Sequence, residues 1–431
     1  MKERMENMVK GIRKIVLLIL MIIAISSISA GKMSSNDEKE ILDIINSYNN
    51  GTSETVPKSN IGISGRNGKE LRGVWVASVI NIDWPSKKGL SIETQKREYL
   101  QILENVKKWN MNAVFVQVKP VGDAIYPSRY APWSEYLTGT QGMNPGYDPL
   151  KFMIEEAHKR GIEFHAWFNP YRLTMNGGIE KLASNNIGRK RPEWTVMYGG
   201  KLYLNPGIPE VNDYVVDSIM EVVKNYNVDG VHMDDYFYPY KVKGQEYPDS
   251  TQYKKYGRNF SNIGDWRRNN INLLIKKLNS SIKKERSDIS FGISPFGVWR
   301  NSSTDPARGS RTQASIQNYD DLYADILKWM ENRWLDYVAP QIYWNQGFEV
   351  AEYNTLVNWW STNARKTNTD LYIGQAAYKV KDWSNSNELA NQINYNRKFS
   401  EVKGSIFFSY KSLRDNPKNV VGSLLNGPYN R

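Results

Sequence analysis

The chain has 431 residues, of which 40% are hydrophobic and 24% charged, values typical of a globular protein. Its formal net charge is +12, but lysine and arginine form no localised run of the kind that binds nucleic acid, so no nucleic-acid partner is expected. The absence of cysteine rules out a disulfide, a cysteine for lipid attachment and a thiol nucleophile within this sequence.

The first thirty residues have the pattern of a secretory signal peptide. Basic residues precede an apolar run, Ile15 to Ile25, and small residues follow up to Ala30. We therefore expect a signal peptide over 1–30 and a secreted or cell-envelope protein. An uncleaved segment is the alternative, and it would be the contact of the chain with a membrane. Residues 31–69 are rich in Ser, Asn, Gly and Lys, which predicts a flexible tether.

From Leu71 onward, short apolar runs alternate with amphipathic runs, which is typical of parallel strands joined by crossover helices. Eight strands are predicted, at Arg72–Ser78, Ala113–Lys119, Glu163–Asn169, Gly230–Tyr236, Ser290–Phe296, Tyr337–Tyr343, Leu371–Tyr378 and Ser405–Tyr410. Helices are predicted between them at Lys96–Trp109, Pro149–Arg160, Pro209–Tyr226, Trp266–Lys284, Asp321–Glu331, Asn354–Ala364 and Glu388–Phe399. This count favours the α/β class and a closed (β/α)8 TIM barrel over 70–415, followed by a C-terminal tail, 416–431. An open doubly wound sheet is disfavoured, because no glycine-rich phosphate turn follows the first strand.

Loops at the carboxyl ends of the strands carry the chemistry in such barrels. Three of these loops, 170–207, 237–263 and 297–318, are long and rich in Tyr, Trp, Asn and Arg. Loops of this length at one face favour a deep groove for an extended polymer.

Carboxylates gather at the same predicted face. Asp234 and Asp235 end the fourth strand, Asp123 follows the second and Asp83 follows the first. Hydrolysis of a glycosidic bond needs one protonated acid and one carboxylate, and two neighbouring carboxylates raise one pKa towards the value that a general acid requires. We predict Asp234, Asp235 and Asp123 as catalytic residues. Because side chains alternate along a strand, only one of the adjacent pair would face the lumen, unless the strand has already broken into loop at this point.

Aromatic side chains, which stack on the apolar faces of sugar rings or fill a barrel core, are also abundant there. Those predicted at the rim are Trp75, Trp84, Trp133, Trp167, Tyr171, Tyr236, Trp299, Tyr343, Trp344 and Tyr378. The predicted substrate-binding residues are Asp83, Trp75, Gln117, His165, Asn169, Arg172, His232, Tyr236, Gln341, Tyr343 and Tyr378, with Asn345 as a further polar partner.

The histidines offer a rival chemistry. His165 and His232 fall on adjacent strands and, with Asp234 or Asp235, could hold the divalent metal of a polysaccharide deacetylase. Barrel metal sites commonly use a His-x-His pair on the first strand, and the first strand here has no histidine. We therefore predict no metal and no cofactor, and we expect these two histidines to act through hydrogen bonds.

Six segments in order carry a family resemblance. They are Leu71-Arg-Gly-Val-Trp-Val-Ala-Ser, Asn81-Ile-Asp-Trp-Pro-Ser, Val121-Gly-Asp-Ala, Trp167-Phe-Asn-Pro-Tyr-Arg, Leu204-Asn-Pro-Gly and Asp229-Gly-Val-His-Met-Asp-Asp-Tyr-Phe-Tyr-Pro. From Leu71 to Leu413 the chain resembles the glycosyl hydrolase-like 10 family of bacterial envelope proteins, which implies a (β/α)8 barrel. Similarity to the member that cleaves peptidoglycan glycan strands stripped of stem peptides implies a glycosidase acting on N-acetylmuramic acid and N-acetylglucosamine polymers.

The expected function is hydrolysis of a bacterial cell-wall polysaccharide, with peptidoglycan glycan strands as substrate. A mechanism that uses two carboxylates, Asp234 or Asp235 with Asp123, and one assisted by a 2-acetamido group of the substrate both stay open. Alternatives of other classes are a wall-glycan-binding scaffold without turnover and the metal-dependent deacetylase.

Overall fold

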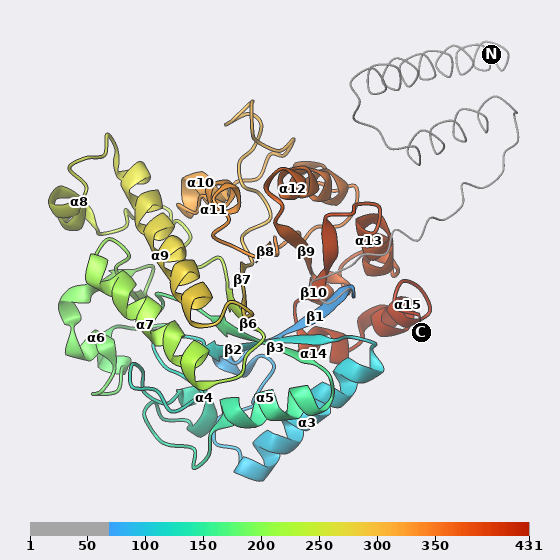
Figure 1. Cartoon of the computed structure of the whole chain (residues 1–431), viewed down its shortest axis with the longest axis horizontal. Coiled ribbons are helices and arrows are strands. Elements are labelled where there is room, and N and C mark those ends of the chain that lie inside the picture. Colours follow the sequence, from blue (N-terminus) through green and yellow to red (C-terminus); the bar gives the residue numbers. More distant parts are fainter. Residues whose placement is uncertain (1–68, 431) are drawn as a thin grey trace, which may run out of the picture. The chain divides into compact units, whose positions relative to one another are not determined.

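A closed barrel of eight parallel strands forms the centre of the part of the chain that the computed structural model describes, residues 69–430 (Figure 1). The strands follow one another around the barrel in chain order, apart from a separate hairpin inserted after the third strand. This confirms the predicted (β/α)8 TIM barrel. The predicted signal peptide and all of the predicted tether except residue 69 lie outside the described residues.

All eight predicted strands are present. The barrel strands are β1 (Leu71–Val76), β2 (Ala113–Lys119), β3 (Glu163–Phe168), β6 (Gly230–Met233), β7 (Ser290–Ile293), β8 (Tyr337–Val338), β9 (Asp370–Gln375) and β10 (Val402–Phe407). The last five barrel strands, β6 to β10, each end three or more residues earlier than predicted. The residues after them therefore belong to the loops that surround the mouth of the barrel.

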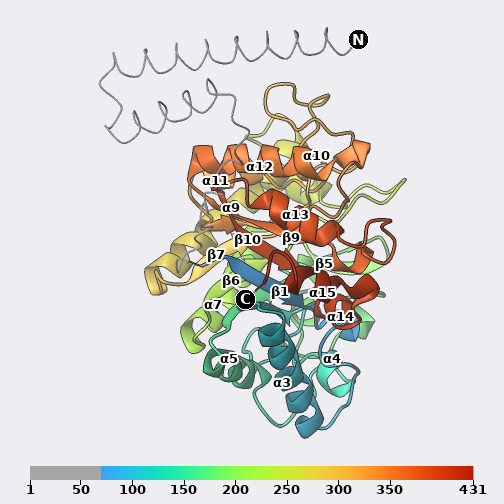
Figure 2. The ribbon, with the colours of Figure 1, turned by 90° about the vertical axis from the view of Figure 1, so that its right-hand side faces the viewer.

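Helices surround the barrel on the outside (Figures 1 and 2). The longer helices are α3 (Ile92–Lys108), α5 (Pro149–Lys159), α7 (Pro209–Asn225), α9 (Ile263–Glu285), α12 (Tyr353–Thr367) and α13 (Glu388–Asn396). The shorter ones are α4 (Glu135–Thr138), α6 (Ile187–Lys190), α8 (Ser250–Tyr256), α10 (Asn318–Asp321), α11 (Ile326–Glu331), α14 (Tyr410–Arg414) and α15 (Val420–Leu425). No helix within residues 69–430 is long and apolar enough to cross a membrane.

The strand sequences alternate between two hydrophobic clusters. On β1, Val74 and Val76 belong to the large cluster that packs against the helices, whereas Trp75 belongs to the smaller cluster inside the barrel. Phe115 from β2 and Tyr337 from β8 extend the interior cluster. This alternation follows from the two-residue period of a strand, and it fills the barrel below the mouth with side chains.

The sequence did not predict the antiparallel hairpin of β4 (Thr195–Tyr198) and β5 (Lys201–Leu204). Its second strand pairs with the loop that follows β3, through a bridge between Tyr203 and Arg172. The hairpin thereby fixes the backbone of Arg172 at the mouth of the barrel.

The C-terminal segment, predicted only as a tail, contains α15 and contacts α13. Tyr429 beyond this helix is buried, and the guanidinium of Arg72 lies 4.5 Å from the centre of its ring. This segment therefore packs against the start of β1 at the amino-terminal end of the barrel.

Candidate active site

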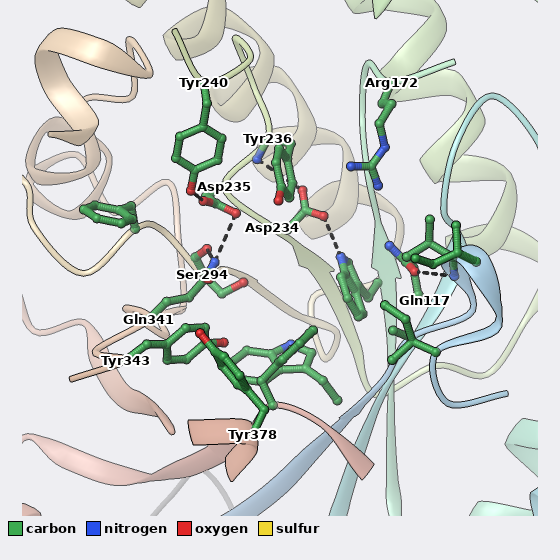
Figure 3. A pocket seen from close by; sticks show the side chains of 18 of the residues that line it. Gln117, Arg172, Asp234, Asp235, Tyr236, Tyr240, Ser294, Gln341, Tyr343 and Tyr378 are labelled. Carbon is green, nitrogen blue, oxygen red and sulfur yellow. Dashed lines mark hydrogen bonds between the residues drawn. The ribbon is translucent and has the colours of Figure 1, made fainter. Parts of the chain in front are cut away.

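A cavity of about 450 Å³ opens at the carboxyl ends of the strands (Figure 3). Its lining residues are Trp75, Ala77, Val79, Ile80, Ile82, Gln117, Trp167, Arg172, Met175, Asp234, Asp235, Tyr236, Tyr240, Ser294, Phe296, Gln341, Tyr343, Trp344, Tyr378, Lys379 and Phe408. Nine of the fourteen residues that the sequence predicts for catalysis or substrate binding lie in this lining. Segments that follow several strands therefore converge on one site, as the barrel architecture requires, although the long loop 297–318 contributes no lining residue.

Asp234 and Asp235 both line this cavity. Strand β6 ends at Met233, so the two aspartates lie in the loop, where the strict alternation of a strand no longer applies. The alternative in which the strand has already ended therefore holds, and both side chains face the cavity. They supply the two carboxyl groups in the cavity lining.

Asp234 is held from the side of β3. Its carboxyl group accepts hydrogen bonds from Trp167 Nε1 at 3.0 Å and from Asn169 Nδ2 at 3.2 Å. Burial, and next the negative charge of Asp235, raise the pKa of Asp234 to about 7. Asp234 is thus a carboxyl group that retains its proton up to neutral pH.

Asp235 is held from the opposite side. It accepts hydrogen bonds from the hydroxyl of Tyr240 and from Gln341 Nε2, the latter at 3.1 Å. Burial raises the pKa of Asp235, while these two hydrogen bonds act against the rise because they stabilise the charged form. The two neighbouring acids therefore occupy different surroundings, which is the condition for separate acid and carboxylate roles.

The cavity walls are largely aromatic. Trp75, Trp344, Tyr343 and Tyr378 line it as predicted, and the rings of Tyr343 and Tyr378 lie 5.8 Å apart at 82°. Ile80 at the rim is 58% exposed and Tyr378 is 38% exposed, so apolar surface continues outwards from the buried acids. Such surface suits the C–H faces of sugar rings.

Four of the predicted rim aromatics lie elsewhere. Trp84, Tyr171 and Trp299 are buried in the large hydrophobic cluster and Trp133 packs against it. For these four residues the alternative role, packing in the hydrophobic core, is the one that the structure shows. Asn169 also stands outside the lining, behind Asp234, where it acts through its hydrogen bond to that carboxyl group.

The two predicted histidines lie inside the barrel, below the cavity. His232 is buried and hydrogen-bonds with Trp75 Nε1 and the hydroxyl of Tyr337, and burial lowers its pKa well below the usual value. His165 stacks on Phe115 with ring centres 4.3 Å apart. Neither lines the cavity, so the structure does not bring them together with Asp234 and Asp235; both extend the side-chain layers of the barrel interior.

Asp83 connects the loops that follow the first and the last strand of the barrel, and it does not line the cavity. Its carboxyl group accepts hydrogen bonds from the backbone nitrogens of Ala77 at 2.8 Å and Lys411 at 2.7 Å, and from the hydroxyl of Ser409 at 2.8 Å. These partners engage both carboxyl oxygens. The structure therefore places Asp83, a predicted substrate-binding residue, outside the cavity lining, where it connects the loops after β1 and β10.

Asp123 is completely buried outside the cavity lining. It accepts hydrogen bonds from the backbone nitrogen of Glu135 at 3.3 Å and from Gln141 Nε2 at 3.2 Å. The loop after β2 folds over this carboxyl group, so the structure does not bring Asp123 to Asp234 and Asp235 as the two-carboxylate hypothesis required.

Several lining residues were not singled out from the sequence. Tyr240 lies five residues after Asp235 in an aromatic segment that could have drawn attention to it, whereas Ser294 and Lys379 carry no local signal. Asn345, a predicted polar partner, hydrogen-bonds instead to the backbone of Gln346. Within residues 69–430, no three His, Asp or Glu side chains are grouped so that they could hold a metal ion.

A barrel with a pair of buried carboxyl groups in an aromatic cavity at the carboxyl ends of its strands has the architecture of a glycoside hydrolase. Residues 70–391 match the family described as glycosyl hydrolase-like 10. The chain belongs to this family and is a glycosyl hydrolase.

Two relatives support this assignment. The chain is 56% identical over 370 residues to glycosyl hydrolase YngK of Bacillus subtilis, which covers 84% of this chain and 72% of that protein. It is 42% identical over 364 residues to glycosyl hydrolase DigH of Escherichia coli, covering 78% and 82% of the two chains. Among solved structures, the glycoside hydrolase domain of PgaB (BpsB) from Bordetella bronchiseptica has a TM-score of 0.53 at 14% identity, covering 82% of this chain and 99% of that one, a likeness of fold alone.

Proposed function

We propose that this glycosyl hydrolase cleaves the glycan strands of bacterial peptidoglycan. The observation that carries the proposal is the pair Asp234 and Asp235, buried side by side in an aromatic cavity. The resemblance to the family member that acts on peptidoglycan strands supplies the polymer, in which every sugar carries a 2-acetamido group. Such a group can replace a second catalytic carboxylate as the nucleophile.

Asp234 is the proposed general acid. Its pKa of about 7 keeps a substantial fraction of the carboxyl group protonated at neutral pH, as protonation of the leaving glycosidic oxygen requires. Trp167 and Asn169 hold the group in place through their hydrogen bonds.

Asp235 is the proposed orienting carboxylate. Hydrogen bonds from Tyr240 and Gln341 favour its charged form, in which it can accept a hydrogen bond from the N–H of the substrate acetamido group. That contact directs the acetamido carbonyl oxygen at the anomeric carbon and stabilises the positive charge that then forms.

The proposed reaction has two steps. In the first, the acetamido oxygen attacks the anomeric carbon, the glycosidic bond breaks, and the proton of Asp234 passes to the leaving oxygen. In the second, water attacks the anomeric carbon of the resulting cyclic oxazolinium ion, Asp234 takes a proton from this water, and the acetamido group re-forms. The anomeric configuration is retained, and Asp234 ends protonated as it began.

The same proposal places the protein outside the cytoplasm. The basic and apolar pattern of 1–30 is that of an export signal, and the wall polymer is the partner that an exported hydrolase of this kind would meet. Fractionation of cells, followed by N-terminal sequencing of the protein recovered, tests export and cleavage near Ala30.

The deciding experiment is mass spectrometry of the products formed from purified, peptide-free glycan strands. New reducing ends are expected with the wild type and with Asp213→Asn, whose aspartate is exposed on α7, and should form far more slowly with Asp234→Asn or Asp235→Asn. A thiazoline analogue of N-acetylglucosamine, which mimics the cyclic intermediate, should inhibit competitively. Binding of the strands without any new reducing end would contradict hydrolysis of this polymer.

A further inference from the structure

Ile80 has a backbone conformation that its side chain disfavours. Its φ is 46° and its ψ is 26°, in the left-handed region, where a side chain branched at Cβ crowds the backbone. Within residues 69–430, nine residues other than glycine have a positive φ; five of them are asparagines, and Ile80 is the one with a β-branched side chain. This conformation lowers the stability of the fold, so the presence of isoleucine at the position needs an explanation.

The hydrogen bonds of the two neighbouring residues fix this conformation. The backbone nitrogen of Val79 donates to Gln117 Oε1 at 3.0 Å, and Gln117 is itself part of the cavity wall (Figure 3). On the other side, Asn81 Nδ2 donates to the backbone oxygen of Tyr136 at 3.0 Å. Ile80 cannot relax without disturbing these bonds. Strained residues persist where surrounding contacts over-determine them, and they are concentrated at functional sites.

Packing does not account for the isoleucine. The side chain of Ile80 is 58% exposed, so most of its apolar surface gains nothing from burial. For stability alone, asparagine or glycine would suit a left-handed backbone better. The next residue, Asn81, is an asparagine with a φ of 56°. We conclude that the apolar side chain of Ile80 is kept for a contact that the folded chain alone does not supply.

The place of Ile80 in the cavity indicates what makes this contact. Ile80 and Ile82 line the same cavity as Asp234 and Asp235, but each of the two acids is only 4% exposed. The acids therefore lie deep in the cavity and Ile80 lies at its entrance. When a glycosidic bond of a polymer reaches the acids, a neighbouring sugar of the same polymer occupies the entrance. The C–H face of a sugar is the apolar surface that it presents there.

We propose that Ile80 is a substrate-positioning residue, whose side chain packs against the C–H face of a sugar next to the one held by the acids. The inference rests on the proposed function and deepens it, because it adds a contact for the polymer at the entrance of the cavity. The fixed turn presents the side chain before the polymer binds, so that no loop has to be ordered on binding. Stability at this turn is thereby lower than another residue would give.

The first test measures kcat and KM on purified, peptide-free glycan strands. Ile80→Asn and Ile80→Ala both remove the apolar contact, and each should raise KM about 5- to 10-fold. The value of kcat should change less than about twofold, because a contact with a neighbouring sugar stabilises the bound substrate and the transition state equally. Ile80→Val keeps most of the apolar surface and should keep KM within about twofold of the wild type. A fall in kcat at unchanged KM, or no change in either, would overturn the inference.

The second test separates the strain from the contact. Asparagine tolerates the left-handed conformation better than alanine does, so the melting temperature of Ile80→Asn should exceed that of Ile80→Ala by about 1–3 °C. Arg333, an exposed residue with a φ of 55° just after α11 and outside the cavity lining, is the matched control. Arg333→Asn should exceed Arg333→Ala in melting temperature by a similar amount, with kcat and KM as in the wild type. A melting temperature of Ile80→Asn at or below that of Ile80→Ala would refute the argument from strain.

Binding measurements separate this inference from the proposed function. If the wild type does not cleave the strands, the proposed function fails, and calorimetry on the same strands decides the inference. An affinity about 5- to 10-fold weaker for Ile80→Asn supports it, whereas equal affinity, or no binding by the wild type, overturns it. Cleavage with an unchanged KM in the Ile80 variants would overturn the inference alone. If Ile80→Asn does not fold, as judged by circular dichroism, Ile80→Ala against Ile80→Val gives the same comparison.

Discussion

Two pairs of buried aspartates at the mouth of the barrel differ in what they face. Asp234 and Asp235 line the cavity, whereas Asp83 and Asp123 are enclosed by the loops after β1 and β2. Burial raises the pKa of all four carboxyl groups. A raised pKa therefore follows from burial and does not by itself identify a reactive acid, and it is access to the cavity that separates the pairs.

The largest expected effect is on the cavity pair. Asp234→Asn should lower kcat by about 10²- to 10⁴-fold, because the amide cannot protonate the leaving oxygen. The melting temperature should not fall, since the amide oxygen can still accept from Trp167 and Asn169 and the amide carries no buried charge. Steady-state kinetics and thermal unfolding measure both. If Asp234→Asn kept full activity, Asp234 could not be the general acid, and access to the cavity would not distinguish the two pairs of aspartates.

The enclosed pair should behave in the opposite way. Asp83→Ala leaves the backbone nitrogens of Ala77 and Lys411 and the hydroxyl of Ser409 without their acceptor, at about 1–3 kcal/mol for each group that stays buried. We expect a marked loss of free energy of unfolding in denaturant titrations, with kcat per folded molecule unchanged. Asp83→Asn, which keeps one acceptor oxygen, should cost less. A large fall in kcat with unchanged stability would assign Asp83 to the site after all.

The sequence predicted the barrel because its signal is local: short apolar, β-branched and aromatic runs, such as Val74, Trp75 and Val76, mark the strands, and amphipathic runs between them mark the helices. The hairpin has a local turn signal as well, since Gly199 and Gly200 separate two short β-type runs. The sequence does not predict that the hairpin fixes the backbone of Arg172, because this depends on a bridge between Arg172 and Tyr203, which are distant in the chain.

The aspartates mark the limit of prediction for the site. Asp234 and Asp235 were found because they end a strand. The sequence could not show that β6 stops at Met233 and lets both face the cavity. Asp123 looked equivalent, and its enclosure depends on Gln141, a contact made 18 residues further along a folded loop. Strand ends can be predicted from local pattern, whereas the direction of a loop side chain is set by tertiary contacts.

Asp123→Asn should have a smaller effect, and it should raise the free energy of unfolding instead of lowering it. The pKa of Asp123 is raised from 3.8 to about 6, chiefly by burial, so the folded state binds its proton more tightly than the unfolded state does. This contribution to stability is complete below pH 3.8 and is lost as pH rises through 6. At pH 7 the neutral amide should therefore raise the free energy of unfolding, by at most about 3 kcal/mol for two pKa units. Denaturant titrations at pH 4 and pH 7 measure this, and an equal effect at both values would contradict it.

The pH dependence of activity gives the smallest expected effect. It distinguishes the two pairs of aspartates, because only the cavity pair should influence it. With a pKa of about 7, Asp234 loses its proton at higher pH, so kcat/KM should fall about tenfold per unit on the alkaline side. The negative charge of Asp235 contributes to that raised pKa, whereas Arg172 lowers it. The residual activity of Asp235→Asn should therefore have its alkaline limb at lower pH, and Asp123→Asn should leave the limb in place. If Asp123→Asn shifted the alkaline limb of the kcat/KM profile, Asp123 would have to take part in the reaction.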